Sequence, residues 1–127
     1  MAFQKSTTVR NAELDQIETT IGTTVTLVLF SGAEPANCAA ADPSGVLATI
    51  TLPTDWLANA SAGVKAKAGT WSVGASASGT VASWRVKDGA AVVHLQGNTA
   101  DMTFDNTSLN SGQTITVNTF SITAGNA

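Results

Sequence analysis

The stretch TVASWRVKDGAAVVHLQ, residues 80–96, decides the fold class of this chain. Polar and apolar residues alternate on both sides of Asp88-Gly89, and this dipeptide between two alternating runs is a strong signal for a β-hairpin. We therefore expect residues 80–87 to pair with residues 91–96. The residues predicted to lie on one face of each strand are Ala82, Trp84 and Val86, and Ala91, Val93 and Leu95.

The same period of two continues outward from the hairpin. Residues 24–30 alternate at first and then become wholly apolar, as a central strand does. Residues 46–52 and 113–123 are further predicted strands, and Gly, Asn, Asp and Pro separate these runs. In the last run the apolar residues change phase, which predicts a β-bulge near Asn118-Thr119. Residues 64–68 alternate small apolar residues with lysine, which indicates one solvated face.

Seven or eight strands without βαβ alternation predict an all-β fold, an antiparallel β-sandwich that is jelly-roll-like. The predicted core residues are Leu27, Leu29, Ile50, Leu52, Trp84, Val86, Val93, Leu95, Phe120 and Ile122.

The N-terminal part has a different pattern. Residues 1–8 are polar and are predicted to form a flexible arm. Residues 9–21 are predicted to form a short helix, capped by Thr7 or Thr8 and ended by Gly22. Its apolar face consists of Leu14, Ile17 and Ile21. Residues 9–127 are thus expected to form a single β-sandwich domain with an N-terminal helix.

The composition favours a binding or structural module over an enzyme. The chain has 127 residues, of which 43% are hydrophobic and 12% charged, with a net charge of −3. Its cations do not cluster, so direct nucleic-acid binding is not expected. No apolar run approaches the roughly 20 residues of a membrane span, and the first residues lack a signal-peptide pattern. The single Cys38 allows no internal disulfide and fits synthesis in a reducing cytoplasm.

Few residues could perform chemistry. The one histidine, His94, has no obvious local partner for acid–base work, and a Cys38–His94 thiol pair is not favoured. Asp101, Asp105 and Asn106 lack the spacing of a calcium loop and are typical of turns. The acids Glu34, Asp42 and Asp55 stand in separate expected loops. We expect no enzymatic activity, no metal and no cofactor.

Aromatic side chains leave one binding alternative open. Trp84 has the phase of a core residue, whereas Trp56 and Trp71 have no clear phase. If exposed in one plane, these two could form a platform for carbohydrate.

Several strings carry a family resemblance over nearly the whole chain. They are Arg10-Asn11-Ala12, Ile21-Gly22-Thr23, LFSGAEPANCAAAD (29–42), LPTDW (52–56), KAGTW (67–71), the aromatic in Trp84-Arg85-Val86, DNTS (105–108), SGQT (111–114) and TAGNA (123–127). In these strings the chain resembles small virion proteins of tailed bacteriophages.

The resemblance implies a non-enzymatic particle component. It implies a capsid decoration or cement protein that bridges major capsid protein subunits on the outside of the virion and is made in the host bacterial cytoplasm. The alternative is a tail or tail-fibre module that binds a receptor or carbohydrate. Self-association as a dimer or trimer is expected, since closed symmetry is usual for such assemblies. We expect the arm to act as a clamp, and the predicted partner contacts are Phe3, Lys5, Arg10, Trp56 and Trp71.

Overall fold

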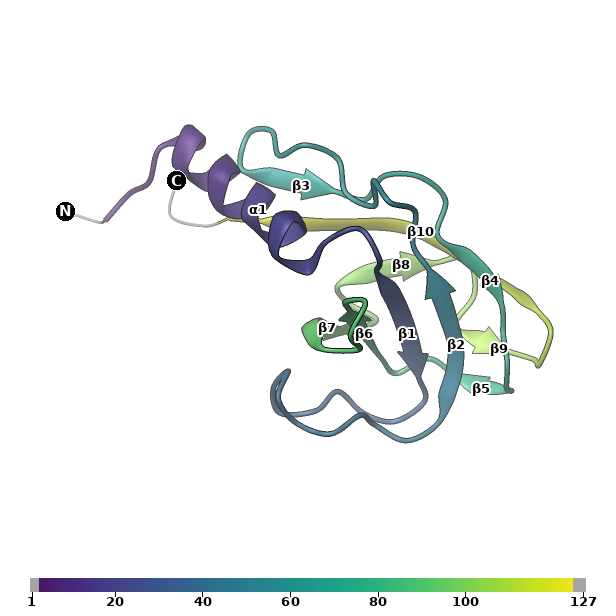
Figure 1. Ribbon diagram of the computed structural model, residues 1–127. Coiled ribbons are helices and arrows are strands. Elements are labelled where there is room, and N and C mark those ends of the chain that lie inside the picture. Colours follow the sequence, from purple (N-terminus) through teal and green to yellow (C-terminus); the bar gives the residue numbers. More distant parts are fainter. Residues whose placement is uncertain (1–2, 125–127) are drawn as a thin grey trace.

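The computed structural model describes residues 3–124 and is mostly β, with antiparallel sheets and one helix (Figure 1). The elements are α1 (Thr7–Ile21), β1 (Thr26–Phe30), β2 (Val46–Thr51), β3 (Val64–Ala66), β4 (Ser72–Gly74), β5 (Gly79–Thr80), β6 (Ser83–Lys87), β7 (Val93–Asn98), β8 (Met102–Phe104), β9 (Ser108–Leu109) and β10 (Thr114–Thr123). There are more strands than the seven or eight expected, because some are only two or three residues long. Over residues 3–124, no helix has the length and apolar character needed to cross a membrane.

The helix begins two residues earlier than predicted. Ser6, not Thr7 or Thr8, is the N-cap, and its Oγ accepts a hydrogen bond from the Val9 N–H at 3.2 Å. Residues 7–8 of the predicted arm are therefore helical, and residues 1–2 lie outside the described part. The predicted end is confirmed: Gly22 has a φ of 92° and donates its N–H to the Glu18 carbonyl, as glycine does after a helix.

A four-stranded antiparallel sheet has the order β2-β1-β6-β7. The predicted pairing of the hairpin strands is confirmed, with Val86 opposite Leu95. The connection, however, is longer than Asp88-Gly89 and includes residues 88–92. Asp88 organises this loop, since its Oδ1 accepts hydrogen bonds from the N–H groups of Ala90 and Val92 at 2.9 and 3.0 Å.

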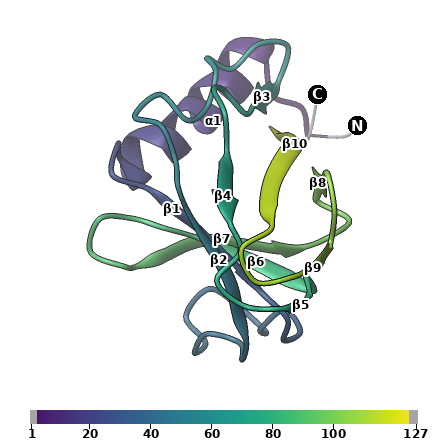
Figure 2. The same cartoon turned by 90° about the vertical axis from the view of Figure 1, so that its right-hand side faces the viewer.

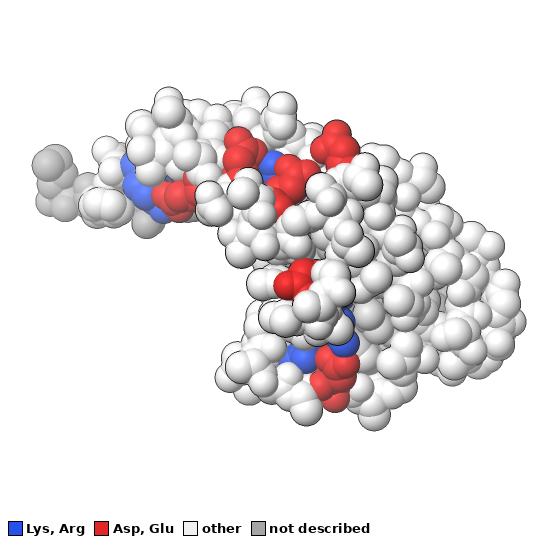
Figure 3. Space-filling model, viewed as in Figure 1, with Lys and Arg blue, Asp and Glu red and all other residues white. Residues whose placement is uncertain are grey.

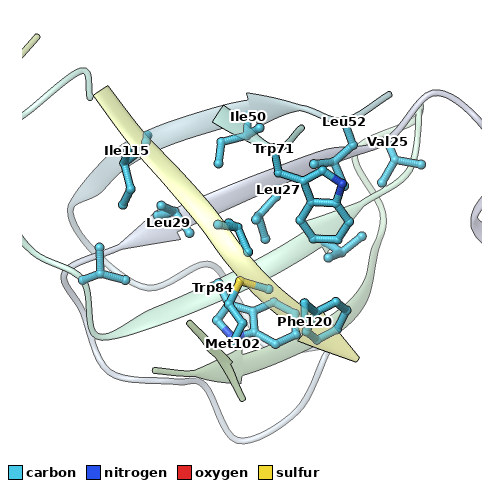
Figure 4. Close-up of a cluster of buried hydrophobic side chains, with 14 of the residues drawn as sticks. Val25, Leu27, Leu29, Ile50, Leu52, Trp71, Trp84, Met102, Ile115 and Phe120 are labelled. Atoms are coloured by element: carbon cyan, nitrogen blue, oxygen red, sulfur yellow. The ribbon is translucent and has the colours of Figure 1, made fainter. Parts of the chain in front are cut away.

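The other sheet is built around β10, which pairs with β3, β4 and β8, while β5 and β9 form a separate pair. The predicted bulge is confirmed by a register shift between Val117 and Thr119. It brings Ile115, Val117 and Phe120 into the core. In Figure 4, β10 crosses one face of the four-stranded sheet, with core side chains between them.

The core contains most of the residues predicted for it, including Leu27, Ile50 and Trp84. Three predicted core residues are only half-buried: Val93, Leu95 and Ile122. Val93 and Leu95 lie on β7, which within residues 3–124 has a neighbouring strand on one side only.

One face of β3 is solvated, as predicted for residues 64–68, but it is not the lysine face. Lys65 is fully buried, whereas Val64 is 37% exposed. The reason is that α1 lies beside β3 (Figure 2) and covers the lysine side of the strand.

Candidate functional site

A buried lysine fixes α1 to the rest of the molecule. Lys65 Nζ lies 2.7 Å from Asp15 Oδ1 and 3.0 Å from Glu18 Oε1, and donates to the Ala58 carbonyl at 3.0 Å. Burial alone would lower the pKa of Lys65, but its hydrogen bonds to Asp15 and Glu18 outweigh this and raise it. The pKa of Asp15 is lowered by the hydrogen bond from Lys65.

The first turns of α1 have further anchors. Asn11 Oδ1 accepts a hydrogen bond from the Gly63 N–H at 2.9 Å, and Arg10 packs against Gly63. Arg10 also reaches Thr7 Oγ1 at 3.3 Å and the Ala124 carbonyl at 3.5 Å. Arg10 is therefore part of the attachment of α1, and the helix is held along most of its length.

This fixed helix carries the N-terminal arm, here defined as residues 3–6. The arm has no regular structure and leads away from the body beyond the start of α1 (Figure 1). Phe3 is 75% exposed, while Lys5 Nζ forms an ion pair with Glu13 Oε2 at 3.0 Å. The predicted contacts Phe3 and Lys5 thus lie together on a projecting segment.

The structure contradicts the roles predicted for Trp56 and Trp71 as partner contacts or as a carbohydrate platform. Both side chains are fully buried, with ring centroids 6.2 Å apart, and their indole N–H groups donate to the carbonyls of Gly22 and Ala68. They form neither an exposed carbohydrate platform nor a contact surface. Their lack of clear phase has a structural cause: each lies outside the regular strands and packs into the core from a connection.

An open hollow lies between α1 and β7, with a cavity volume of about 210 Å³. Its apolar lining includes Ile17 and Ile21 from α1 and Leu95 from β7, and Glu13 and His94 are among its polar lining residues. Figure 3 shows a concavity under α1, with acidic and basic groups on the surface around it. Sequence reasoning missed this hollow, because it depends on how α1 is placed against β7.

His94 does have a local partner, contrary to expectation. Its Nε2 lies 2.8 Å from Asp88 Oδ2, across the five-residue hairpin loop. The pKa of Asp88 is lowered, first by the hydrogen bond with His94 and then by those from the backbone N–H groups of Val92 and Ala90. Since the same carboxylate organises the loop, the pair stabilises the hairpin as well as orienting the imidazole beside the hollow.

Arg85 is a second buried cation that sequence reasoning missed. It is 1% exposed on β6 and donates to the Ala40 and Asn37 carbonyls, to Asp42 Oδ1 and to Gln96 Oε1 at 2.9–3.1 Å. The pKa of Asp42 is lowered by hydrogen bonds from Lys87 and Arg85. The sequence signal for this buried cation was an arginine between Trp84 and Val86 in a predicted strand. Arg85 holds the loop after β1 in place.

Asp101 and Asn106 act in turns, as predicted, whereas Asp105 bonds the backbone of β10 and does not. Asp101 Oδ2 accepts from the Asn98 N–H, Asp105 Oδ1 from the Thr116 N–H and Asn106 Oδ1 from the Ser108 N–H, at 2.9–3.0 Å. Within residues 3–124, no three His, Cys, Asp or Glu side chains are grouped as a metal site would need. Cys38 is a half-buried free thiol in the loop after β1.

Comparison with protein-family models, with curated proteins and with solved structures found no match for this chain. The features that bear on function are therefore the arm, its fixed helix and the hollow beside β7.

Proposed function

We propose that this protein is a non-enzymatic structural component of a phage virion, which decorates the capsid and stabilises it by bridging major capsid protein subunits. The observation that carries the proposal is that an exposed arm extends from a helix that is fixed to the body. The ion pairs of Lys65 fix α1 to the body, and in the arm before α1 the side chain of Phe3 is 75% exposed. The resemblance to small virion proteins of tailed phages gives this arm its context.

An arm of this kind suits bridging. A segment that becomes ordered on a partner covers much surface from a small body, although ordering costs part of the interaction free energy. A fixed helix limits that cost to the few residues before it. The weakly charged Thr, Ser and Ala surface fits broad contacts made by apolar burial and hydrogen bonds. We also propose that the four-stranded sheet and the layer around β10 form a jelly-roll-like β-sandwich, which the core packed between them supports.

Location in the particle tests the proposal. We expect a cryo-electron map of the virion to show the protein on the outer capsid lattice, bridging neighbouring capsid subunits. Density confined to the tail would overturn the capsid role and favour the alternative tail module.

A truncation tests the role of the arm. Removing residues 1–5 leaves the Ser6 cap and α1 intact. We expect capsids to bind less of the truncated protein and to lose part of their resistance to heat. The control is Val46→Ala, which shortens an exposed apolar side chain, 47% exposed, on β2. Full occupancy and full heat resistance after truncation would contradict the clamp.

A further inference from the structure

Leu95 lies between two hollows at the open side of the molecule. One is the hollow under α1, and the other has a volume of about 310 Å³ and is lined by Trp84, Phe120 and Ile122, among others. Leu95 and Ile122 are only half-buried. Apolar surface is therefore left partly uncovered along one side of β7.

The same strand has an open backbone edge. β7 ends the sheet order, and among residues 3–124 no strand pairs with its outer side. The opposite edge is different, because the Leu47 carbonyl on β2 accepts a hydrogen bond from the Ser76 N–H at 2.8 Å. Natural edge strands repel added strands with charged residues or proline, and the sequence VHLQGN of β7 contains no Lys, Arg, Asp, Glu or Pro.

Polar side chains of β7 are already bound within their own chain. His94 pairs with Asp88, and the Gln96 amide donates to the Pro35 carbonyl at 2.8 Å. These contacts hold the strand in place. At the end of β7, Asn98 already bonds Asp101 through its N–H and its carbonyl. The features left for a partner are the outer backbone edge before Asn98 and the hollows beside Leu95, a combination that suits an extended segment carrying one large apolar side chain.

The chain itself contains such a segment. The arm is short and without regular structure, its Ser6 is extended with φ −65° and ψ 158°, and Phe3 is its exposed aromatic residue. In its own molecule the arm leads away from the body, while the hollow lies under α1 (Figures 1 and 3). The arm of a second copy can therefore approach a hollow that the chain's own arm leaves open.

The charges of Lys5 and Glu13 also favour the arm of a second copy as the occupant of the hollow. Glu13 lines the hollow under α1, and it is also the residue that pairs with Lys5. An incoming arm would bring its own Lys5 two residues after Phe3, so the contact that exists within one chain can form between two. Exchange of identical elements between protomers is a low-cost route to assembly for this reason.

We propose that the hollow under α1 receives the arm of a second copy, with Phe3 against Ile17 and Leu95, Lys5 on Glu13, and the arm backbone along the edge of β7. The proposal rests on the clamp role of the arm and names its partner: arms link copies to one another while their bodies sit on the capsid. Reciprocal exchange closes a dimer and cyclic exchange closes a trimer.

A charge-reversal mixture tests the exchange in solution. Lys5→Glu and Glu13→Lys each place like charges together, and each should weaken self-association roughly fivefold in sedimentation equilibrium. An equimolar mixture should recover the wild-type association of an exchanged dimer, and all but one contact of an exchanged trimer, because an arm of one variant then meets an opposite charge on the other. A mixture no stronger than the single variants, or a wild-type protein that stays monomeric at all concentrations, overturns the proposal.

A second pair of variants tests the aromatic contact. Phe3→Ala should weaken self-association by roughly 10- to 100-fold, as expected for losing a buried Phe side chain. The control Val9→Ala removes a 47% exposed side chain of α1 that does not line the hollow, and should leave association unchanged. Amide exchange of β7 should slow with protein concentration in the wild type and not in Phe3→Ala. Protection independent of concentration would mean that the arm enters its own hollow, which overturns the exchange.

The outcomes separate this inference from the proposed function. If virions need the arm for occupancy but the protein never self-associates through it, the exchange is wrong and capsid decoration stands. If arms link copies in solution but the protein is absent from the capsid, the exchange stands and the decoration role is wrong.

Discussion

At the scale of single residues, Lys65 shows how this chain uses its few charges. A fully buried ammonium is costly unless charged partners and hydrogen bonds surround it. Asp15, Glu18 and the Ala58 carbonyl supply these, and both acids belong to the helix that would otherwise be too short to stand alone. The ion pairs therefore connect the polar side of α1 to the body and fix the base of the arm.

Replacing that lysine should loosen α1. We expect Lys65→Met to lower the free energy of unfolding by about 1–3 kcal/mol, because it removes three charge-assisted hydrogen bonds while roughly keeping side-chain volume. Lys5→Met is the control, since its pair with Glu13 is at the surface and is worth at most about 1 kcal/mol. Urea denaturation measures both. Equal losses in the two variants would show that Lys65 does not hold the helix.

Gly97 provides a steric test of the side chains beside β7. A Cβ at this position would clash with Asp101 Oδ2 and would lie 2.6 Å from Trp84 Cζ2, on a ring that packs edge-on against Phe120. Gly97→Ala should cost about 1–3 kcal/mol of stability, the usual range for overpacking. Gly74→Ala is the matched control, since its Cβ would meet only the Gly112 carbonyl oxygen at 3.7 Å. Thermal unfolding should distinguish them, and an unchanged Gly97→Ala protein would refute the packing described.

At the scale of elements, the strands could be predicted better than their faces. Alternating or wholly apolar runs located β1, β2, β6 and β7, because β2 has one side against the core and β1 and β6 are buried on both sides. The pattern in β3 could not show which face is buried, since a lysine normally indicates solvent and here meets two acids from a helix about fifty residues away in sequence. Local patterns cannot contain that tertiary contact.

The hairpin loop gives an element-scale prediction. Ala91 has a φ of 64°, a left-handed conformation that costs an L-residue roughly 1–2 kcal/mol and glycine almost nothing. Ala91→Gly should therefore stabilise the protein by about 0.5–1 kcal/mol after the added flexibility of the unfolded chain is subtracted. Ala90→Gly, in the same loop without a positive φ, should be neutral or destabilising. Chemical denaturation of both variants checks this, and a destabilised Ala91→Gly protein would contradict it.

At the scale of the whole molecule, the candidate site could be predicted only in part. Phe3 and Lys5 were expected contacts, and they do lie on a projecting arm. The hollow under α1 could not be predicted, because it arises where a helix and an edge strand distant in sequence come together. Trp56 and Trp71 were wrongly expected to be contact residues, because they lie in connections whose sequence has no periodicity. They are in fact among the largest side chains of the core.

The charge pairs together predict how stability depends on pH. The pKa values of Asp15, Asp42 and Asp88 lie below the ordinary 3.8 in the folded protein, so their contribution is complete above that pH and is lost as pH falls through the lowered values. The pKa of Lys65 lies above 10.5, so its contribution is complete below that pH and is lost as pH rises through the raised value. We expect a plateau of stability between roughly pH 5 and pH 9, with a decline on each side.

Asparagine variants test whether Asp15, Asp42 and Asp88 cause the decline of stability at low pH. Asp15→Asn, Asp42→Asn and Asp88→Asn each keep the side-chain shape but cannot ionise. Each should lower stability at neutral pH and flatten the decline below about pH 4, because one group that binds protons more tightly in the unfolded chain has been removed. Asp55→Asn, at an exposed loop position, serves as the control. Urea denaturation from about pH 2.5 to about pH 7 gives the slopes. If all three variants keep the wild-type slope, protons are taken up elsewhere, and these three carboxylates do not couple folding to pH.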